Sequence, residues 1–254
     1  MSLPLSIFII AKNEVDRIGP TLEAVQGLSD DIVVIDSGST DGTQELAERF
    51  GARVIFNPWP GYGLQKQFGE KQCRHDWMLN IDADEVVTAE LATAIKAAIG
   101  QADLSPCGFE TDIIEMFPGE ARPHAWAFRL SPVRLYHKQV GRYSPSSVHD
   151  RVDLVKGTPT HRLSGVIEHH SIRSLGHELI KLNAYADMQA DDLDKKGRKI
   201  GAVRLVAEFP LAFLKAYLAR RHFVRGLYGF MTAMNYAFYR YLRLAKYWER
   251  RLGR

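Results

Sequence analysis

Two carboxylates one residue apart, Asp82 and Asp84, follow an apolar run at residues 77–81. The pattern predicts that both lie at the exposed end of a strand. Oxygen ligands suit hard cations, and Mg²⁺ or Mn²⁺ bound by one or two carboxylates usually takes its other ligands from phosphates and water. The pair is therefore typical of a nucleoside diphosphate site, although a turn and a helix N-cap ahead of Thr88 would explain the same residues.

A second polar segment, residues 36–42, is rich in Asp, Ser, Thr and Gly. Such residues form turns whose backbone amides can face an anion, and a helix predicted to begin near Asp41 would add its N-terminus. Asp36, at the last position of a predicted strand, can accept hydrogen bonds from the edge of a nucleobase. A generic strand-to-helix turn with Asp41 as N-cap is the alternative.

Several other chemistries are excluded by spacing. No G-x-G-x-x-G follows a predicted strand and no G-x-x-x-x-G-K-[ST] occurs, which argues against dinucleotide binding and P-loop hydrolysis. Nine histidines include four within 17 positions, but none has the H-E-x-x-H or Cys/His finger spacing of a zinc site. The two acidic and polar loops therefore remain the candidate site.

These loops need a sheet that brings them to one edge. Through the first 100 residues, short β-branched runs alternate with helical patterns. We predict strands at residues 5–11, 31–36, 53–56 and 77–81, and helices at residues 17–28, 41–50, 64–73 and 89–99. Alternation of this kind gives right-handed crossovers and a mostly parallel α/β sheet, which binds ligands beyond the carboxyl ends of its strands.

Three segments, IIAKNE at 9–14, VVIDSGSTDGT at 33–43 and NIDADE at 80–85, together resemble glycosyltransferase family 2 in order and spacing. Further segments, VHD at 148–150, IEHHSIRS at 167–174 and FPLAF at 209–213, resemble its subgroup of bacterial lipopolysaccharide core β-glucosyltransferases. The resemblance implies a glycosyltransferase A-type fold, a UDP-sugar donor such as UDP-glucose, a Mg²⁺ or Mn²⁺ cofactor and inversion at the anomeric carbon. It also implies a lipid-linked saccharide acceptor.

The resemblance assigns roles by position. Those of the nucleotide and donor side fall on Ala11, Asn13, Glu14, Asp36, Ser37, Lys66 and Asp82. Those of the metal fall on Asp84, with Asp82 and His169 as further contacts. Inversion needs one base on the face opposite the leaving group. Asp150 is the first candidate and His149 the second, and Arg134 either faces the acceptor or lies at a charged strand edge.

We predict two domains. Residues 1–173 form the nucleotide-sugar-binding catalytic domain, with a donor half at 1–100 and an acceptor half at 101–173 that carries strand patterns at 128–136 and 148–155. Residues 174–254 form a helical extension rich in basic and aromatic residues. Two enzyme classes and one binding class remain open: the glycosyltransferase, a sugar nucleotidyltransferase, and a non-catalytic nucleotide-sugar or membrane-binding protein.

The C-terminal extension differs in charge from the rest. Residues 211–254 carry ten Lys or Arg and one acid, a net +9, whereas residues 1–210 sum to −6. The longest uncharged run there, residues 226–239, has 14 residues, short of the roughly 20 that span a bilayer. We expect this region to lie on an anionic membrane surface through residues such as Arg240, Arg243 and Lys246, and not on nucleic acid, or else to pack as a helical subdomain.

The expected setting is the cytoplasm, with the protein peripheral on the inner face of the cytoplasmic membrane. Cys73 and Cys107 are the chain's two cysteines and need no disulfide in a chain of 254 residues. The first residues lack a basic region and have only a short apolar run before Lys12, which indicates a buried strand and not a signal peptide. The oligomeric state is left open by the sequence.

Overall fold

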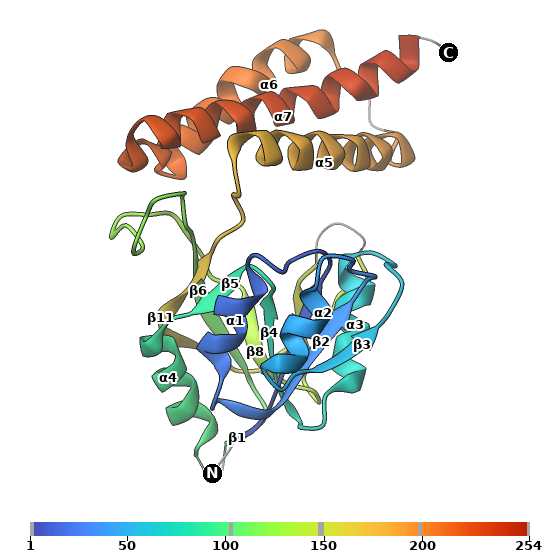
Figure 1. The fold of residues 1–254 in the computed structure, drawn as a ribbon. Coiled ribbons are helices and arrows are strands. Elements are labelled where there is room, and N and C mark those ends of the chain that lie inside the picture. Colours follow the sequence, from blue (N-terminus) through green and yellow to red (C-terminus); the bar gives the residue numbers. More distant parts are fainter. Residues whose placement is uncertain (1–2, 102–103, 147–149, 198–199, 253–254) are drawn as a thin grey trace. The chain divides into compact units, whose positions relative to one another are not determined.

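The computed structural model describes residues 3–101, 104–146, 150–197 and 200–252. The chain divides into two compact units (Figure 1). One unit, called here the sheet unit, consists of Met1–Ile114 and Arg129–His170. The other, called here the helical unit, consists of Glu115–Phe128 and Ser171–Arg254.

Four parallel strands form the first half of the sheet, in the order β3-β2-β1-β4. Their bounds are Leu3–Ala11 (β1), Ser29–Asp36 (β2), Arg53–Phe56 (β3) and Trp77–Asp82 (β4). The helices between and after them are Ile18–Val25 (α1), Thr43–Arg49 (α2), Tyr62–Gln72 (α3) and Ala89–Ile99 (α4). All eight elements were predicted from the sequence, with differences of at most a few residues at their ends.

The second half of the sheet is antiparallel, so the sheet as a whole is mixed. Beyond β4 the order continues β8-β6-β11-β5, with β7 paired to β6. The bounds are Glu85–Val87 (β5), Gly108–Glu115 (β6), Arg129–Leu130 (β7), Val133–His137 (β8) and Thr160–His169 (β11). A separate ribbon pairs Gly141–Tyr143 (β9) with Val152–Leu154 (β10).

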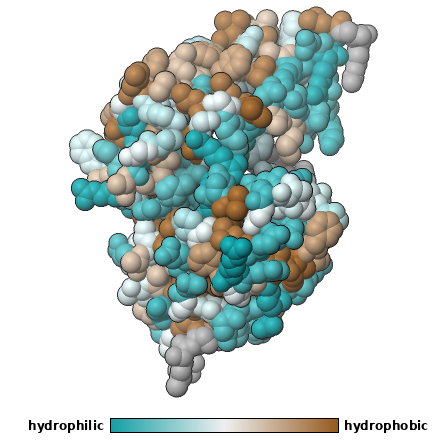
Figure 2. Space-filling view, in the orientation of Figure 1, coloured by the Kyte–Doolittle hydropathy of each residue, from teal (hydrophilic) through white to brown (hydrophobic). Residues whose placement is uncertain are grey.

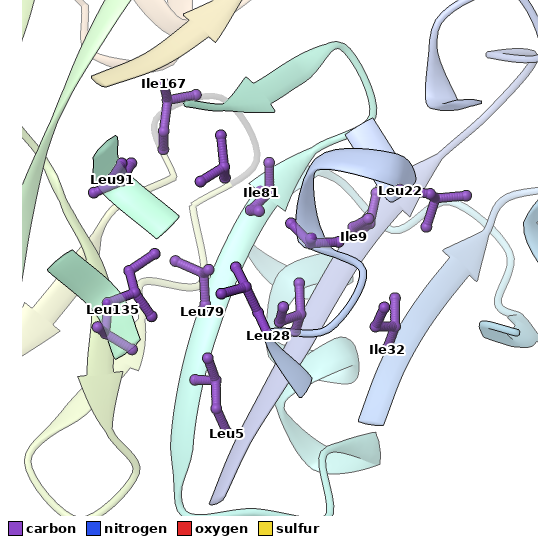
Figure 3. Close-up of a cluster of buried hydrophobic side chains, with 14 of the residues drawn as sticks. Leu5, Ile9, Leu22, Leu28, Ile32, Leu79, Ile81, Leu91, Leu135 and Ile167 are labelled. Atoms are coloured by element: carbon purple, nitrogen blue, oxygen red, sulfur yellow. The ribbon is translucent and has the colours of Figure 1, made fainter. Parts of the chain in front are cut away.

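Both faces of β1 are buried, as its unbroken apolar run requires. Leu5, Ile7 and Ile9 point into one cluster with residues of α1 and α4, whereas Phe8 and Ile10 point into another on the opposite face. Figure 3 shows the first cluster, in which Leu22 of α1 lies beside Ile9 of β1, and Leu79 and Ile81 lie along the adjacent strand β4. Each such aliphatic side chain contributes about 1.5–3 kcal/mol when fully buried. The core therefore holds rigid the strand ends that carry the polar loops.

The helical unit is built from three long helices. They are Leu175–Lys195 (α5), Ala202–Leu214 (α6) and Gly226–Leu252 (α7), with a π-helical turn Lys215–Ala219 (η1) and a 3-10 turn His222–Arg225 (η2) between the last two. Ala190, Ile200, Leu244 and Tyr247 form its buried core. Within the described residues, no helix is long and apolar enough to cross a membrane.

The segment between β6 and β7 belongs to this helical unit. Arg225, almost fully buried, pairs with Glu120 and donates to the Glu115 carbonyl oxygen at 3.0 Å. Phe117 packs edge-on against His222 with ring centroids 5.6 Å apart. These contacts tie the segment to η2 and α7.

Basic residues of α7 are held by acids of α5 and α6. Glu208 lies 2.7 Å from Arg240 and 2.8 Å from Arg243, and Lys246 lies 2.8 Å from Asp187. Arg250 pairs with Asp191 in the same way. The positive charges expected at a membrane surface on Arg240, Arg243 and Lys246 are thus neutralised within the helical unit.

Candidate functional site

The first two predicted motifs are joined by hydrogen bonds at the carboxyl ends of β1 and β2. Asn13 donates its backbone N–H to Ser39 Oγ at 2.8 Å and accepts from the Thr40 N–H at 2.9 Å through its side-chain oxygen. The Glu14 N–H donates to Thr43 Oγ1 at 2.8 Å. Asn13 adopts a left-handed backbone with φ 57°, which asparagine tolerates better than most residues. The two loops therefore form one structure.

Asp36 is fully buried and organises its own loop. Its Oδ1 accepts from the N–H groups of Gly38 and Ser39 at 2.8 and 2.9 Å and from Gln44 Nε2 at 2.6 Å. Its Oδ2 accepts from the Ser39 hydroxyl. The contact with uracil that the resemblance implies for Asp36 stays a prediction.

Ser37 and Ala11 meet at the same edge. The Ser37 N–H donates to the Ala11 carbonyl oxygen at 3.0 Å, and Ser37 Oγ accepts from Gln65 Nε2 at 2.9 Å. Because Gln65 precedes Lys66 on α3, this bond also links the loop after β2 to that helix. The seven residues predicted for the nucleotide side thus lie in three places: the end of β1 with its loop, the end of β2 with its loop, and α3 with the last residue of β4.

Asp84 lies in the turn between β4 and β5, where its carboxylate contacts the side chains of His169 and Arg17. Its Oδ1 lies 3.4 Å from His169 Nε2, and its Oδ2 lies 3.1 Å from Arg17 Nη1. Burial opposes ionisation, but the hydrogen bond and charge of His169, together with the charge of Arg17, lower the pKa of the Asp84 carboxyl. Asp84 is therefore a carboxylate, the form in which it can bind a cation.

Arg17 was not singled out from the sequence. Besides Asp84 it contacts Glu14 through two nitrogens and donates to the His170 carbonyl oxygen at 3.2 Å. It therefore connects the first motif, through Glu14, to the third motif and to the end of β11. The sequence offers no signal for this role, because Arg17 lies in no recognisable motif and its partners are distant along the chain.

Asp82, Lys66 and Asp150 form a second group. Lys66, 1% exposed, places Nζ 2.8 Å from Asp82 Oδ1 and 2.5 Å from Asp150 Oδ2. Burial alone would lower the pKa of Lys66, but the nearby carboxylate charges of Asp82 and Asp150 oppose this effect, and the pKa of Lys66 is raised. The Lys66 ammonium thus lies between the two carboxylates.

A buried layer beneath Asp82 holds that carboxylate. Arg134 donates to Asn80 Oδ1 at 2.8 Å and to Glu85 Oε1 at 2.6 Å, and its Nη2 lies 3.4 Å from Asp82 Oδ2. The Asp82 N–H donates to Glu85 Oε2 at 2.8 Å. Burial opposes ionisation of Asp82, but the charges of Lys66 and Arg134 lower the pKa of its carboxyl well below the usual range. Arg134 is buried in this layer and is not at a strand edge.

The donor set suits a divalent cation that shares its coordination with a phosphate. Asp84 and His169 converge to within 3.4 Å, with Asp82 two residues from Asp84. In the part of the chain that the structure describes, no three His, Cys, Asp or Glu side chains form a complete metal site by themselves. Mg²⁺ and Mn²⁺ commonly need only one or two carboxylates when a diphosphate and water complete the shell. The second candidate base, His149, lies outside the described residues.

Comparisons with known proteins agree on the family. The model for glycosyl transferase family 2 matches residues 6–153. An uncharacterized glycosyltransferase, RP128 of Rickettsia prowazekii, is 37% identical over 250 residues, 95% of this chain and 86% of that protein. The lipopolysaccharide core biosynthesis glycosyltransferase LpsC of Rhizobium meliloti is 30% identical over 262 residues, 98% of this chain and 93% of LpsC.

Among solved structures, S. aureus TarS 1-349 has a TM-score of 0.51 at 14% identity and covers 98% of this chain and 92% of that one. This likeness concerns the fold alone, and it supports the predicted glycosyltransferase A-type architecture. Because the family model covers more than half of the chain, and a relative 30% identical spans nearly all of it, the enzyme with these three loops is a member of glycosyl transferase family 2.

Proposed function

We propose that this family 2 glycosyltransferase moves a sugar, with glucose as the first candidate, from a UDP-sugar to a saccharide of a lipopolysaccharide inner core or a similar glycolipid, with inversion at the anomeric carbon. The relationship to LpsC, a lipopolysaccharide core biosynthesis glycosyltransferase by name, supports the class of acceptor. The resemblance of residues 148–150, 167–174 and 209–213 to lipopolysaccharide core β-glucosyltransferases supports glucose as the donor sugar. The family excludes a sugar nucleotidyltransferase.

One observation carries the proposal. A carboxylate–imidazole pair, Asp84 with His169, and a carboxylate–ammonium–carboxylate group, Asp82 with Lys66 and Asp150, both arise at residues 82–84, at the carboxyl end of β4. A donor diphosphate needs cations, and an acceptor hydroxyl needs a carboxylate base. Both chemical requirements are met by side chains that gather around Asp82 and Asp84: Lys66 and Asp150 at the first, His169 at the second.

Asp84 and His169, with Asp82 beside them, are the residues that would hold a divalent cation. When bound, that cation supplies positive charge that stabilises the diphosphate as it leaves. Lys66 adds a second positive charge from the protein itself. Arg17, which contacts Asp84 in this structure, keeps that carboxylate oriented.

In the proposed chemical step, the Asp150 carboxylate accepts the proton of the acceptor hydroxyl. The acceptor hydroxyl oxygen forms a bond to the anomeric carbon while the bond from that carbon to the β-phosphate oxygen breaks, and its electron pair leaves with UDP. The hydroxyl proton passes to the Asp150 carboxylate, as a general base removes it on the face opposite the leaving group. The products are the inverted glycoside and UDP.

The direct test is a screen of UDP-sugars with and without Mn²⁺, read first as thermal stabilisation and then as transfer to lipopolysaccharide core oligosaccharides. A ligand that binds only the folded state at 100 times its Kd stabilises by about 2.7 kcal/mol. We expect UDP-glucose with Mn²⁺ to raise the melting temperature and ADP-glucose to leave it unchanged. Equal stabilisation by both, or stabilisation by neither, would contradict the proposed donor.

The helical unit supports a peripheral association with an anionic membrane surface. Large apolar side chains are exposed at steps of three to five residues along α6 and η1, at Val203, Val206, Leu211, Leu214 and Leu218, and at steps of three or four along α7, at Leu227, Phe230, Met234 and Phe238. In Figure 2 hydrophobic residues gather over α6 and the adjoining part of α7. An apolar face of this length is expected to be covered in the cell.

The charge around this face supports lipid as its occupant. Residues 209–248 contain no Asp or Glu, and two basic side chains at its end, Lys215 and Arg221, are exposed. An apolar face bordered by lysine and arginine is what binds an anionic lipid surface. The lipid-linked acceptor would be reached from such a surface. The basic residues that serve this contact are thus Lys215 and Arg221, and not Arg240, Arg243 and Lys246, which are already paired.

A further inference from the structure

One face of helix α3 contacts both ends of the chain segment that runs from Tyr143 to Asp150. Gly63, Lys66, Gln67 and Glu70 follow the spacing of a single helix face. Lys66 contacts Asp150, Gln67 Nε2 donates to the Tyr143 carbonyl oxygen at 2.6 Å, and Glu70 Oε1 accepts the Tyr143 N–H at 2.8 Å. The helix thus holds both ends of the segment from Tyr143 to Asp150.

Gly63 allows this segment to approach the helix closely. The Gly63 N–H donates to the Ser146 carbonyl oxygen at 2.9 Å. A Cβ atom at this position would lie 2.1 Å from the Ser144 carbonyl oxygen and 2.6 Å from that of Ser146. Any side chain would therefore push the backbone of the segment away. The contact is made one helical turn before Lys66, on the same face.

Lys66 adds the ionic part of the attachment. Its ammonium is shared between Asp150 Oδ2 at 2.5 Å and Asp82 Oδ1 at 2.8 Å, and the Tyr143 ring centroid lies 5.1 Å from Nζ. A buried ammonium needs paired charges around it, because removal of one partner leaves an uncompensated charge. Because Lys66 Nζ contacts both carboxylates, it fixes the position of the Asp150 carboxylate relative to that of Asp82.

We propose that Lys66 is a positioning residue for the base: besides any contact with the donor, it fixes the Asp150 carboxylate at a set distance from the donor-side carboxylate Asp82, with Gly63 holding the segment that carries it. The inference rests on the proposed function, in which Asp150 is the base. In this role Lys66 takes no proton from the acceptor. Its effect on catalysis passes through Asp150.

A double-mutant cycle tests this coupling. Lys66→Ala, Asp150→Asn and the double variant are compared for kcat and donor KM with the UDP-sugar identified in the screen, and for the Kd of UDP with Mn²⁺. Lys71→Ala, an exposed lysine on the same helix, is the matched control and keeps the wild-type constants. We expect Lys66→Ala to lower kcat about 10–100-fold, the usual loss when an oriented functional group loses its supporting partner. In the Asp150→Asn background the same change should lower kcat less than about threefold, because coupled residues are not additive.

Two further measurements separate a positioning role from a structural one. Ethylammonium added to Lys66→Ala should restore part of the lost kcat, and it should restore none in the double variant, whereas tetramethylammonium, which has no N–H, should restore none in either. Gly63→Ala should lower kcat while the Kd of UDP stays within about twofold of wild type, within the error of independent sites. If Lys66→Ala does not fold, as judged by circular dichroism, Gly63→Ala carries the same comparison.

The outcomes are distinct. The positioning role would be overturned if the two substitutions lowered kcat additively in free energy in the double variant. It would also be overturned if Lys66→Ala changed only the donor KM and the Kd of UDP. Either result would leave the proposed function intact. A Gly63→Ala variant with wild-type kcat would overturn it as well. Full activity of Asp150→Asn, or no sugar transfer by the wild type, would overturn the proposed function and this inference together.

Discussion

Asp84 and His169 lie against each other because the strands beside them pair: Asp84 Oδ1 is 3.4 Å from His169 Nε2, and the next residue, Glu85, is the antiparallel partner of His169 in the β5–β11 pair. The His170 N–H also donates to the Asp84 carbonyl oxygen at 2.8 Å. A shift of this register by one residue would turn the imidazole to the other face of the sheet. A strand of three residues thus decides whether the carboxylate and imidazole can act together.

The first prediction concerns the metal. Asp84→Asn removes the carboxylate that suits a hard cation, so we expect Mn²⁺ to lose its effect on UDP binding and sugar transfer to fall about 100-fold, the upper end of the range for loss of a metal-site contact. Isothermal titration of UDP with and without Mn²⁺ measures this. Glu48→Gln, an exposed acid on α2, should behave as wild type. Unchanged, Mn²⁺-dependent UDP affinity in Asp84→Asn would show that the cation lies elsewhere.

The second prediction decides between the two candidate bases. Asp150→Asn should lower the transfer rate by roughly 10²–10⁴, the range for removal of a general base, with UDP affinity retained. His149→Ala should retain turnover. The rates are measured at saturating donor. The reverse pattern would move the base to His149, and loss of donor binding in Asp150→Asn would place Asp150 on the donor side.

The third prediction uses Asp31, a fully buried carboxylate at the start of β2, away from the site. Burial opposes its ionisation, but hydrogen bonds from Ser6, the Arg74 N–H and Arg53 lower the pKa of Asp31 in the folded state. Because the folded value lies below the unfolded one of about 3.9, Asp31 stabilises the fold above that pH and the stabilisation is lost as pH falls through the folded value.

Asp31→Asn should therefore lower the free energy of unfolding at pH 7 by about 1.5–3 kcal/mol, as expected for lost hydrogen bonds to a charged group. Its stability should also fall less steeply than that of the wild type as the pH drops below about 4. Urea unfolding at several pH values measures both effects. The neighbouring exposed Asp30→Asn is the control and should change little. Parallel pH curves for wild type and Asp31→Asn would refute the assigned stabilisation.

The fourth prediction separates lipid contact from internal packing in the helical unit. Lys215→Gln with Arg221→Gln should weaken co-sedimentation with anionic liposomes by up to about 30-fold, since each charge near the surface is worth about 1 kcal/mol, and should leave the melting temperature unchanged. Arg240→Gln with Arg243→Gln should instead lower the melting temperature, because Glu208 loses both partners.

Added salt should weaken liposome binding, because the Debye length is only about 8 Å at physiological ionic strength. Neutral liposomes should capture much less protein. Binding that is indifferent to lipid charge would contradict the membrane surface. Sedimentation of the free protein as a dimer would point to a second copy of the chain as the occupant of the apolar face.

The local sequence predicted a strand or helix wherever the residues of one short segment were enough to define it. The strands from Leu3–Ala11 to Trp77–Asp82 and the helices between them were predictable because each shows its own hydrophobic period and ends in recognisable turn residues. Pairing in the second half of the sheet was not predictable, because antiparallel partners such as β8 and β4 are far apart in the chain. The expected mostly parallel sheet is therefore parallel only across its first four strands.

The sequence by itself determined the family, the alternating α/β first half and the three loops that carry acidic and polar residues, because these are properties of residue type and near spacing. Only the tertiary structure decided which charges meet: Arg17 with Asp84, Lys66 between Asp82 and Asp150, and Arg243 with Glu208. The reason is physical. Ion pairs form between side chains that folding brings to within a few ångströms, and a charge count along the chain contains no information about those distances.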